Sequence, residues 1–177
     1  MHRITFTFGP PYDIDHYGWV ELIVEAGGQV AHGAHTIPIH VAQYDVANLG
    51  RVSHVANAEP QMHYGWWHGD NGPESMDTII LLDIRPTAST GLLSVRARAV
   101  DRFEPSKRVE TEFTVTRPML RQFQRDCGRV LRKEAKEAVL IGEEAATAQE
   151  TLARSPSTMM VEGSDKASFC ERLVRYP

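Results

Sequence analysis

The chain has 177 residues, of which 42% are hydrophobic and 24% are charged, which is the length and composition of one globular domain with a buried core. This composition excludes an intrinsically disordered protein. The formal net charge of −4 at pH 7 excludes a broad basic surface for nucleic acid or for an anionic membrane.

Three consecutive strands are expected in the first part of the chain. Residues 2–8 alternate between apolar and polar side chains, which is typical of a strand, and the prolines after Gly9 end it. A second strand is expected at 19–25 and a third at 29–39, because the glycine pair at 27–28 favours a hairpin turn between them.

A helix and then a loop are expected next. Between Tyr44 and Asn57 apolar residues recur at three-residue spacing, and Asp45 near the start supports a helix, which Gly50 disfavours. The irregular segment 58–76 contains the run MHYGWWHGDNGPES, which is rich in aromatic residues and turn formers and therefore predicts a loop.

Three more strands are expected at 77–84, 92–100 and 108–115, separated by turns. The last two have one apolar face and one charged face, so as antiparallel neighbours they would pair arginine with glutamate on the solvent side. The charged residues are Arg96, Arg98, Glu110 and Glu112.

A long amphipathic helix is expected after these strands. Thr116 is the predicted N-cap, and Pro118 fits the first turn, where its missing N–H costs nothing. Apolar residues at spacings of three and four extend the helix to Ile141, and the pattern continues to Leu152. Its polar face carries four basic residues: Arg121, Arg125, Arg132 and Lys136.

This order of elements, βββαβββα, predicts a single α+β domain over residues 1–154. It would consist of an antiparallel sheet of about six strands, packed on one face by helices, with a long C-terminal helix. Residues 155–177 are expected to form a polar tail, with a short docking helix as one interpretation. No signal peptide or apolar run of about 20 residues is recognisable, so the cytoplasm is the expected location.

Histidine is the residue type that raises the question of a metal site or of catalysis. The candidate ligands are His32, His35, His40, His63 and His68, with Asp70 beside the last. A zinc or iron site needs three or four such groups converging at about 2.0–2.2 Å, and the spacing here matches no metal motif. Solvated or hydrogen-bonded histidines are the simpler interpretation, and no cofactor is expected. Neither a nucleophile elbow nor a phosphate-binding loop is present in the sequence.

The aromatic run favours a binding surface for a protein partner, because tryptophan and tyrosine dominate interface hot spots. The candidate partner-binding residues are Tyr64, Trp66, Trp67, His68 and Asp70. The alternative is that Trp66 and Trp67 fold back and cover one end of the core, and the sequence does not separate the two interpretations.

The second half of the chain, from about Asp77 to Leu131, resembles small bacterial immunity-type proteins of polymorphic toxin systems. The resemblance rests on a strand hairpin followed by a capped Leu-x-x-Phe helix, here EFTVTRPMLRQF at 112–123. It covers about a third of the chain, and it implies a non-enzymatic protein that binds another protein.

Three functional hypotheses follow. The leading one is a protein-binding module that neutralises, regulates or scaffolds a partner. The alternative is a metal-assisted enzyme, for example a hydrolase, that uses the clustered histidines. The third is a subunit of a nucleic-acid-processing or phage-related assembly, in which the basic residues at 121, 125, 132 and 136 contact phosphate.

Overall fold

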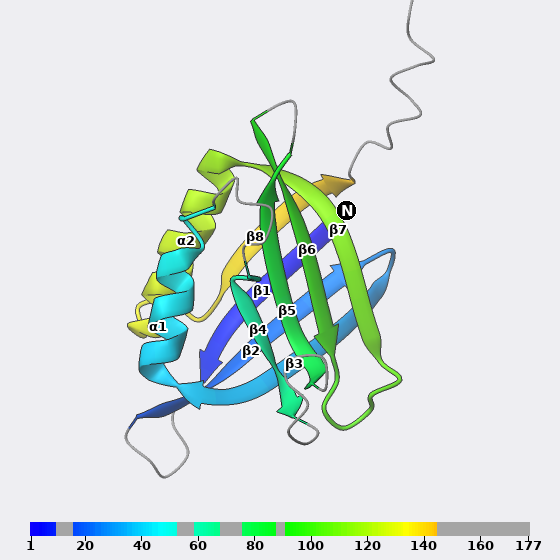
Figure 1. Ribbon diagram of the computed structural model, residues 1–177, viewed down its shortest axis with the longest axis vertical. Helices are drawn as coiled ribbons and strands as arrows, with labels where there is room; N and C mark the ends of the chain where they lie inside the picture. The colour runs from blue at the N-terminus through cyan, green and yellow to red at the C-terminus, as the bar shows by residue number, and fades with distance from the viewer. Residues whose placement is uncertain (10–15, 53–58, 68–75, 88–90, 145–177) are drawn as a thin grey trace, which may run out of the picture. The chain divides into compact units, whose positions relative to one another are not determined.

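The computed structural model describes residues 1–9, 16–52, 59–67, 76–87 and 91–144 (Figure 1). All of them belong to one compact unit, Met1–Ala145, and the second unit, Ala146–Pro177, lies outside the described residues. The predicted polar tail at 155–177 therefore falls outside the described residues as well.

The described residues form eight strands and two helices. In chain order these are β1 (His2–Gly9), β2 (Tyr17–Ala26), β3 (Gln29–Pro38), α1 (Ile39–Asn48), β4 (Met62–Trp67), β5 (Met76–Pro86), β6 (Leu92–Val100), β7 (Arg108–Thr116), α2 (Arg117–Leu131) and β8 (Ala138–Glu144). The α+β class is as predicted, but the expectation of about six strands was wrong. Neither helix in the described part of the chain is long and apolar enough to cross a membrane.

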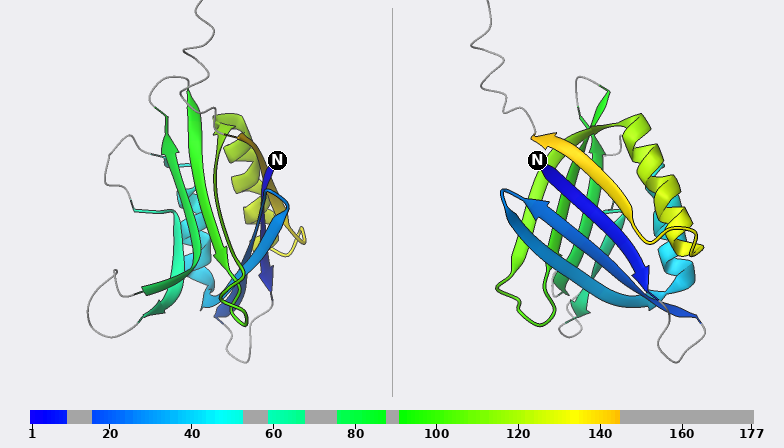
Figure 2. Two further views of the ribbon diagram at one scale, coloured as in Figure 1. Left: turned by 90° about the vertical axis from the view of Figure 1, so that its right-hand side faces the viewer. Right: turned by 180° about the vertical axis from the view of Figure 1, so that it is seen from behind.

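The strands form one antiparallel ladder in the order β3-β2-β1-β8-β7-β6-β5-β4. Within the described residues β7 and β8 pair only at Phe113 with Glu144 and Thr114 with Glu143. This short junction divides the ladder into two four-stranded sheets, β3-β2-β1-β8 and β7-β6-β5-β4. Seen from behind in Figure 2, the first sheet crosses in front of the second.

The prediction of a single sheet with helices on one face was therefore wrong. The inner face of each sheet packs on the other sheet, with β2 and β3 against β5, β6 and β7, while α1 and α2 lie together along one side of the unit. The physical reason is that alternation along a strand identifies its buried face but does not identify what covers that face.

Helix α2 ends at Leu131 and does not continue to Ile141 or beyond, as the sequence had predicted. Lys133 has a left-handed backbone with φ of 62°, and its N–H donates to the carbonyl of Val130 over 2.9 Å. The N–H of Glu134 donates to the carbonyl of Arg129, two residues before the helix end, over 2.8 Å. These two bonds form a Schellman motif, which ends the helix.

The segment after this motif is a strand, β8, which the sequence-based prediction had absorbed into the helix. Ala138 and Leu140, two residues apart, are buried, whereas Ile141, which a helical spacing put on the core face, is 47% exposed. β8 pairs with β1 from His2 opposite Gly142 to Phe6 opposite Ala138.

Two other boundaries differ from the prediction. Helix α1 begins at Ile39, before the expected start at Tyr44, and ends at Asn48, and residues 53–57 of the expected helix lie outside the described residues. Residues 62–67, predicted as part of a loop, form β4, which pairs with β5 and buries Met62.

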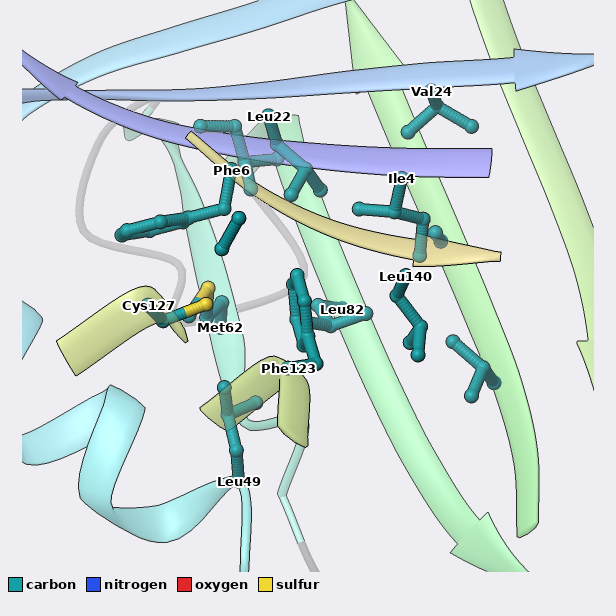
Figure 3. Close-up of a cluster of buried hydrophobic side chains, with 14 of the residues drawn as sticks. Ile4, Phe6, Leu22, Val24, Leu49, Met62, Leu82, Phe123, Cys127 and Leu140 are labelled. Carbon is teal, nitrogen blue, oxygen red and sulfur yellow. The ribbon is translucent and has the colours of Figure 1, made fainter. Parts of the chain in front are cut away.

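The core lies between the two sheets and the helices (Figure 3). Ile4 and Phe6 on β1 face Leu82 on β5, and Phe123 and Cys127 of α2 close the same cluster from the side. Burial raises the pKa of the Cys127 thiol well above its ordinary value, so this cysteine acts as a packing group.

Helix α2 is fixed by its N-cap and by a side chain at its middle. Thr116 accepts a hydrogen bond from the N–H of Met119 over 3.4 Å, which confirms the predicted N-cap. The side-chain amide of Gln124 donates to the carbonyls of Val46 (3.0 Å) and Ala47 (2.9 Å) near the C-terminus of α1. These bonds add a partner to carbonyls in the last turn of α1, where the carbonyl of Val46 also accepts from the N–H of Leu49 over 3.3 Å.

Candidate functional site

An arginine packed among aromatic rings marks one end of the unit, at the turn between β6 and β7. The guanidinium carbon of Arg102 lies 5.5 Å from the ring centroid of Trp19 on β2 and 5.4 Å from that of Trp66 on β4. The ring centroid of Phe103 is 5.8 Å away. Trp19 and Trp66 belong to different sheets, so Arg102 connects the sheets by cation–π contacts. We call these four residues the arginine–aromatic cluster.

Two rings of this cluster face solvent. Trp66 is 48% exposed and Phe103 is 89% exposed. Large aromatic side chains held at a surface beside an arginine have the composition of an interface hot spot, whereas a purely structural cluster would bury them.

His35 and Tyr64 form the inner wall of the cluster. The ring centroid of His35 lies 5.3 Å from that of Trp66 and 6.2 Å from that of Tyr64. Nδ1 of His35 is 2.9 Å from the carbonyl oxygen of Thr36, to which it donates, and Nε2 is buried without a hydrogen-bond partner among the described residues. The ring of His35 therefore packs against the ring of Trp66.

Tyr64 is anchored to helix α1. Its hydroxyl donates to the carboxylate of Asp45, and its pKa is raised far above the ordinary value by burial and by that contact. Burial also raises the pKa of Asp45, and the hydrogen bond from Tyr64 offsets part of this rise. The Tyr64 hydroxyl is thus engaged within the fold, while Trp66, two residues later, reaches the surface.

A groove of about 690 Å³ lies beside the cluster. Trp66, Ile79 and Val100 are among its apolar lining residues, and Arg102 and Arg108 are among its charged ones. Since β4, β5, β6, β7 and the β6–β7 turn all contribute to the lining, the groove exists only when this sheet is assembled.

A row of ion pairs on the outer face of β6 and β7 continues from the groove. Arg98 lies opposite Glu110 in the strand register and donates to it over 2.5 Å, and Arg96 donates to the same carboxylate over 2.7 Å. The predicted pairing of arginines with glutamates is therefore confirmed. Burial alone would raise the pKa of Glu110, but the hydrogen bonds and charges of the two arginines together lower it.

The candidate metal ligands that the structure describes do not converge. His32 contacts Glu21 over 3.0 Å, Nε2 of His63 lies 2.8 Å from the Thr78 hydroxyl, and His40 is exposed on α1. Within the described ranges no group of three histidine, cysteine, aspartate or glutamate side chains could hold a metal ion. His68 and Asp70 lie outside the described residues, as does the side chain of Trp67.

The basic residues expected on one helix face are divided between two segments. Arg121 and Arg125 are exposed on α2, Arg132 caps it and pairs with Glu134 over 2.8 Å, and Lys136 lies in the connection to β8. Lys136 was predicted on the helix because the helix was predicted too long.

Sequence reasoning selected Tyr64 and Trp66 but missed Trp19, Arg102 and Phe103. The missed signal was Phe103, a large aromatic residue in the otherwise polar turn DRFEPSK. Nothing in the sequence placed Trp19 near that turn, because the two are brought together by the crossing of the sheets. Comparisons of the chain with protein-family models, with curated proteins and with solved structures found no match.

Proposed function

We propose that this domain is a non-enzymatic protein-binding module that neutralises, regulates or scaffolds a protein partner through the arginine–aromatic cluster and the adjoining groove. The observation that carries the proposal is the exposure of Trp66 and Phe103 around the guanidinium group of Arg102. The resemblance to immunity-type proteins points to the same class of function.

The geometry suits protein recognition because the cluster is already ordered. Trp66 contacts the ring of His35 and has the guanidinium group of Arg102 over its own ring, so little side-chain freedom remains to be lost on binding. Tryptophan and arginine are also the residue types that most often carry binding energy at protein interfaces.

Site-specific photo-crosslinking tests this proposal in cells of the source organism. A photoreactive phenylalanine analogue at Phe103 should give a discrete crosslinked protein, because this side chain is almost fully exposed at the cluster. The matched control is Tyr44 on α1, another aromatic residue with 66% exposure that belongs neither to the cluster nor to the groove lining, and it should give none.

The purified partner then allows an affinity measurement. Phe103→Ala should weaken binding by about tenfold or more, as expected of a hot-spot aromatic residue, with an unchanged melting temperature. Tyr44→Ala should leave the affinity unchanged. Equal crosslinking from both positions, or equal affinity of both variants, would contradict the proposal.

A further inference from the structure

We propose that the protein partner binds by adding an extended segment of its own backbone to the free edge of β3, beside the arginine–aromatic cluster. This inference rests on the proposed function and adds to it the form in which the partner is recognised. It follows from the hydrogen bonds that β3 leaves unused and from the place to which its edge leads.

β3 is one of the two end strands of the ladder, so within the described residues it pairs with β2 alone. The N–H of Ile39 donates to the carbonyl of His16 over 2.8 Å, so residue 39 and every second residue before it direct their backbone groups to β2. The residues between them direct their N–H and C=O groups away from β2: Val30, His32, Ala34 and Thr36. Nδ1 of His35 donates to the carbonyl of Thr36 over 2.9 Å, and the other outward groups have no hydrogen-bond partner in the described part of the chain.

The sequence of β3 does not protect this edge. An unpaired edge usually carries a feature that discourages pairing with another chain, such as a charged side chain, a proline or a bulge. β3 has ten residues, QVAHGAHTIP, with no lysine, arginine, aspartate or glutamate, and its one proline is the last residue. The other end strand, β4, has six residues and a shift in register between Tyr64 and Gly65. Of the two edges, that of β3 is therefore the one suited to receive a further strand.

The edge of β3 leads to the arginine–aromatic cluster. Thr36, near one end of the edge, lies opposite Trp19 of the cluster in the β2–β3 register. The neighbouring His35 contacts the ring of Trp66. A segment paired with β3 therefore also reaches the rings of the cluster. Hydrogen bonds to the β3 backbone would supply affinity and the rings would select side chains, which is how peptides that add to a sheet are usually recognised.

The surroundings of β3 favour a single extended segment over a second copy of this chain. The β6–β7 turn extends past this edge in Figures 1 and 2, and its Arg102 contacts Trp19 on the strand next to β3. Two copies paired through β3 would be related by a two-fold axis perpendicular to the joined sheet, which brings both β6–β7 turns to the same side of it. A single strand needs only about 4.8 Å beside β3 and carries no second layer.

Photo-crosslinking from the edge is the first test. Val30 is 48% exposed on β3, and Ile141 is 47% exposed on β8, which is paired on both sides. In the strand register both residues belong to one row across the sheet, so they lie on the same face. A photoreactive residue at Val30 should capture the protein that Phe103 captures, whereas one at Ile141 should capture none. Capture from Ile141 as well would show binding to the sheet face instead of the edge.

The crosslinked segment, made as a synthetic peptide, allows a second test. Methylation of one backbone nitrogen at a time removes single N–H donors. Because a strand directs alternate N–H groups to its neighbour, methylation at every second residue should weaken binding to the full chain about tenfold, and methylation between those positions should not. Fluorescence anisotropy of the labelled peptide measures the affinity. Losses that do not alternate along the peptide would overturn strand addition.

A variant of β3 makes the matching test on the protein. Ala34→Pro removes one outward N–H and should weaken binding of the peptide about tenfold. Ala34→Val keeps this N–H in a strand position and should bind the peptide as the wild type does. Equal affinity of both variants would contradict the inference. If proline at this position unfolds the chain, as a melting curve would show, the methylation series decides.

Failure of this inference differs from failure of the proposed function. Capture from Phe103 but not from Val30 would reject strand addition and leave the protein-binding function in place. Capture from neither position would count against both. A full chain that sediments as a dimer, and as a monomer in Ala34→Pro, would assign the edge to a second copy and overturn the inference.

Discussion

At the scale of single residues, the contact between Asp45 and Tyr64 shows how the fold positions the candidate site. Tyr64 lies two residues before Trp66 on β4, and its hydroxyl donates to Asp45 on α1. The strand that presents Trp66 is thereby tied to a helix, at the expense of burying a carboxylate whose pKa is raised by that burial.

This buried carboxylate should make stability depend on pH. Because the pKa of Asp45 is raised above its ordinary value of 3.8 in the folded state, the folded protein binds a proton there more tightly than the unfolded chain does. The contribution of this group to the free energy of unfolding is therefore largest at low pH and falls as the pH rises through the interval between 3.8 and the raised pKa.

Asp45→Asn keeps an oxygen that accepts from Tyr64 and removes the charge. The free energy of unfolding of the variant should therefore not contain the fall with pH that Asp45 causes. Urea unfolding at a series of pH values checks it: the difference in unfolding free energy between the variant and the wild type should grow in favour of the variant as pH rises through the interval. Groups whose pKa is lowered, such as Glu110, titrate alike in both proteins and cancel in the difference. A difference that is constant with pH would contradict the prediction.

At the scale of elements, one side chain supplies hydrogen bonds between the two helices. Gln124 of α2 bonds to two carbonyls of α1, and Gly50, just after α1, makes room for it. A Cβ at position 50 would lie 2.6 Å from the side-chain oxygen of Gln124 and would displace the amide.

A double-mutant cycle tests these hydrogen bonds. Gln124→Ala should lower the free energy of unfolding by about 1 kcal/mol, the usual net contribution of such hydrogen bonds. Gly50→Ala should lower it by a similar amount, because it displaces the same amide. In the Gln124→Ala background Gly50→Ala should not lower the free energy of unfolding further, because the amide that its Cβ would displace is absent. Additive costs in urea unfolding would show that the two positions act independently.

The boundaries of the helices and strands show which elements can be predicted from the sequence and which cannot. β6 and β7 were predicted within a residue, because their buried and charged positions alternate without interruption. The end of α2 was missed because the residue in the left-handed position is Lys133, and sequence reasoning expects glycine there. β4 was missed because the glycine and aromatic residues of HYGWW are typical of loops, and only pairing with β5 makes them a strand.

At the scale of the whole molecule, the two sheets meet where Gly142 of β8 lies against the buried ring of Phe113 on β7. A Cβ at position 142 would come within 1.8 Å of that ring. Because Phe113 is fully buried, the ring has no free space into which to move, and the junction between the sheets requires glycine.

Gly142→Ala should therefore lower the free energy of unfolding by about 1–3 kcal/mol, the usual cost of overpacking a core. Gly128→Ala on α2 is the matched control. Its new Cβ would meet only an arginine side chain at 3.4 Å, so the better helix former should raise stability by about 0.5–1 kcal/mol. Urea unfolding followed by tryptophan fluorescence measures both. Stabilisation by both substitutions would show that Phe113 moves aside.

The candidate site is also formed only by the fold of the whole molecule. The residues of the cluster come from separate elements: Trp19 from β2, Trp66 from β4 and Arg102 from the β6–β7 turn. No local sequence pattern joins them. Sequence reasoning found Trp66 because its aromatic neighbours are unusual in composition. It did not find Arg102, because an arginine in a polar turn is ordinary until the crossing of the sheets surrounds it with rings.

The ladder order has a consequence for how the protein is made. β1 and β8, the first and last strands of the described chain, are neighbours in the middle of the ladder, with His2 opposite Gly142. During synthesis the N-terminal strands emerge first and wait with one edge of β1 unpaired until β8 has left the ribosome. Sequence-distant pairing of this kind slows folding and exposes strand edges meanwhile. The unit is thus complete only after its last strand has been translated, and we expect its strand edges to be most open to aggregation before then.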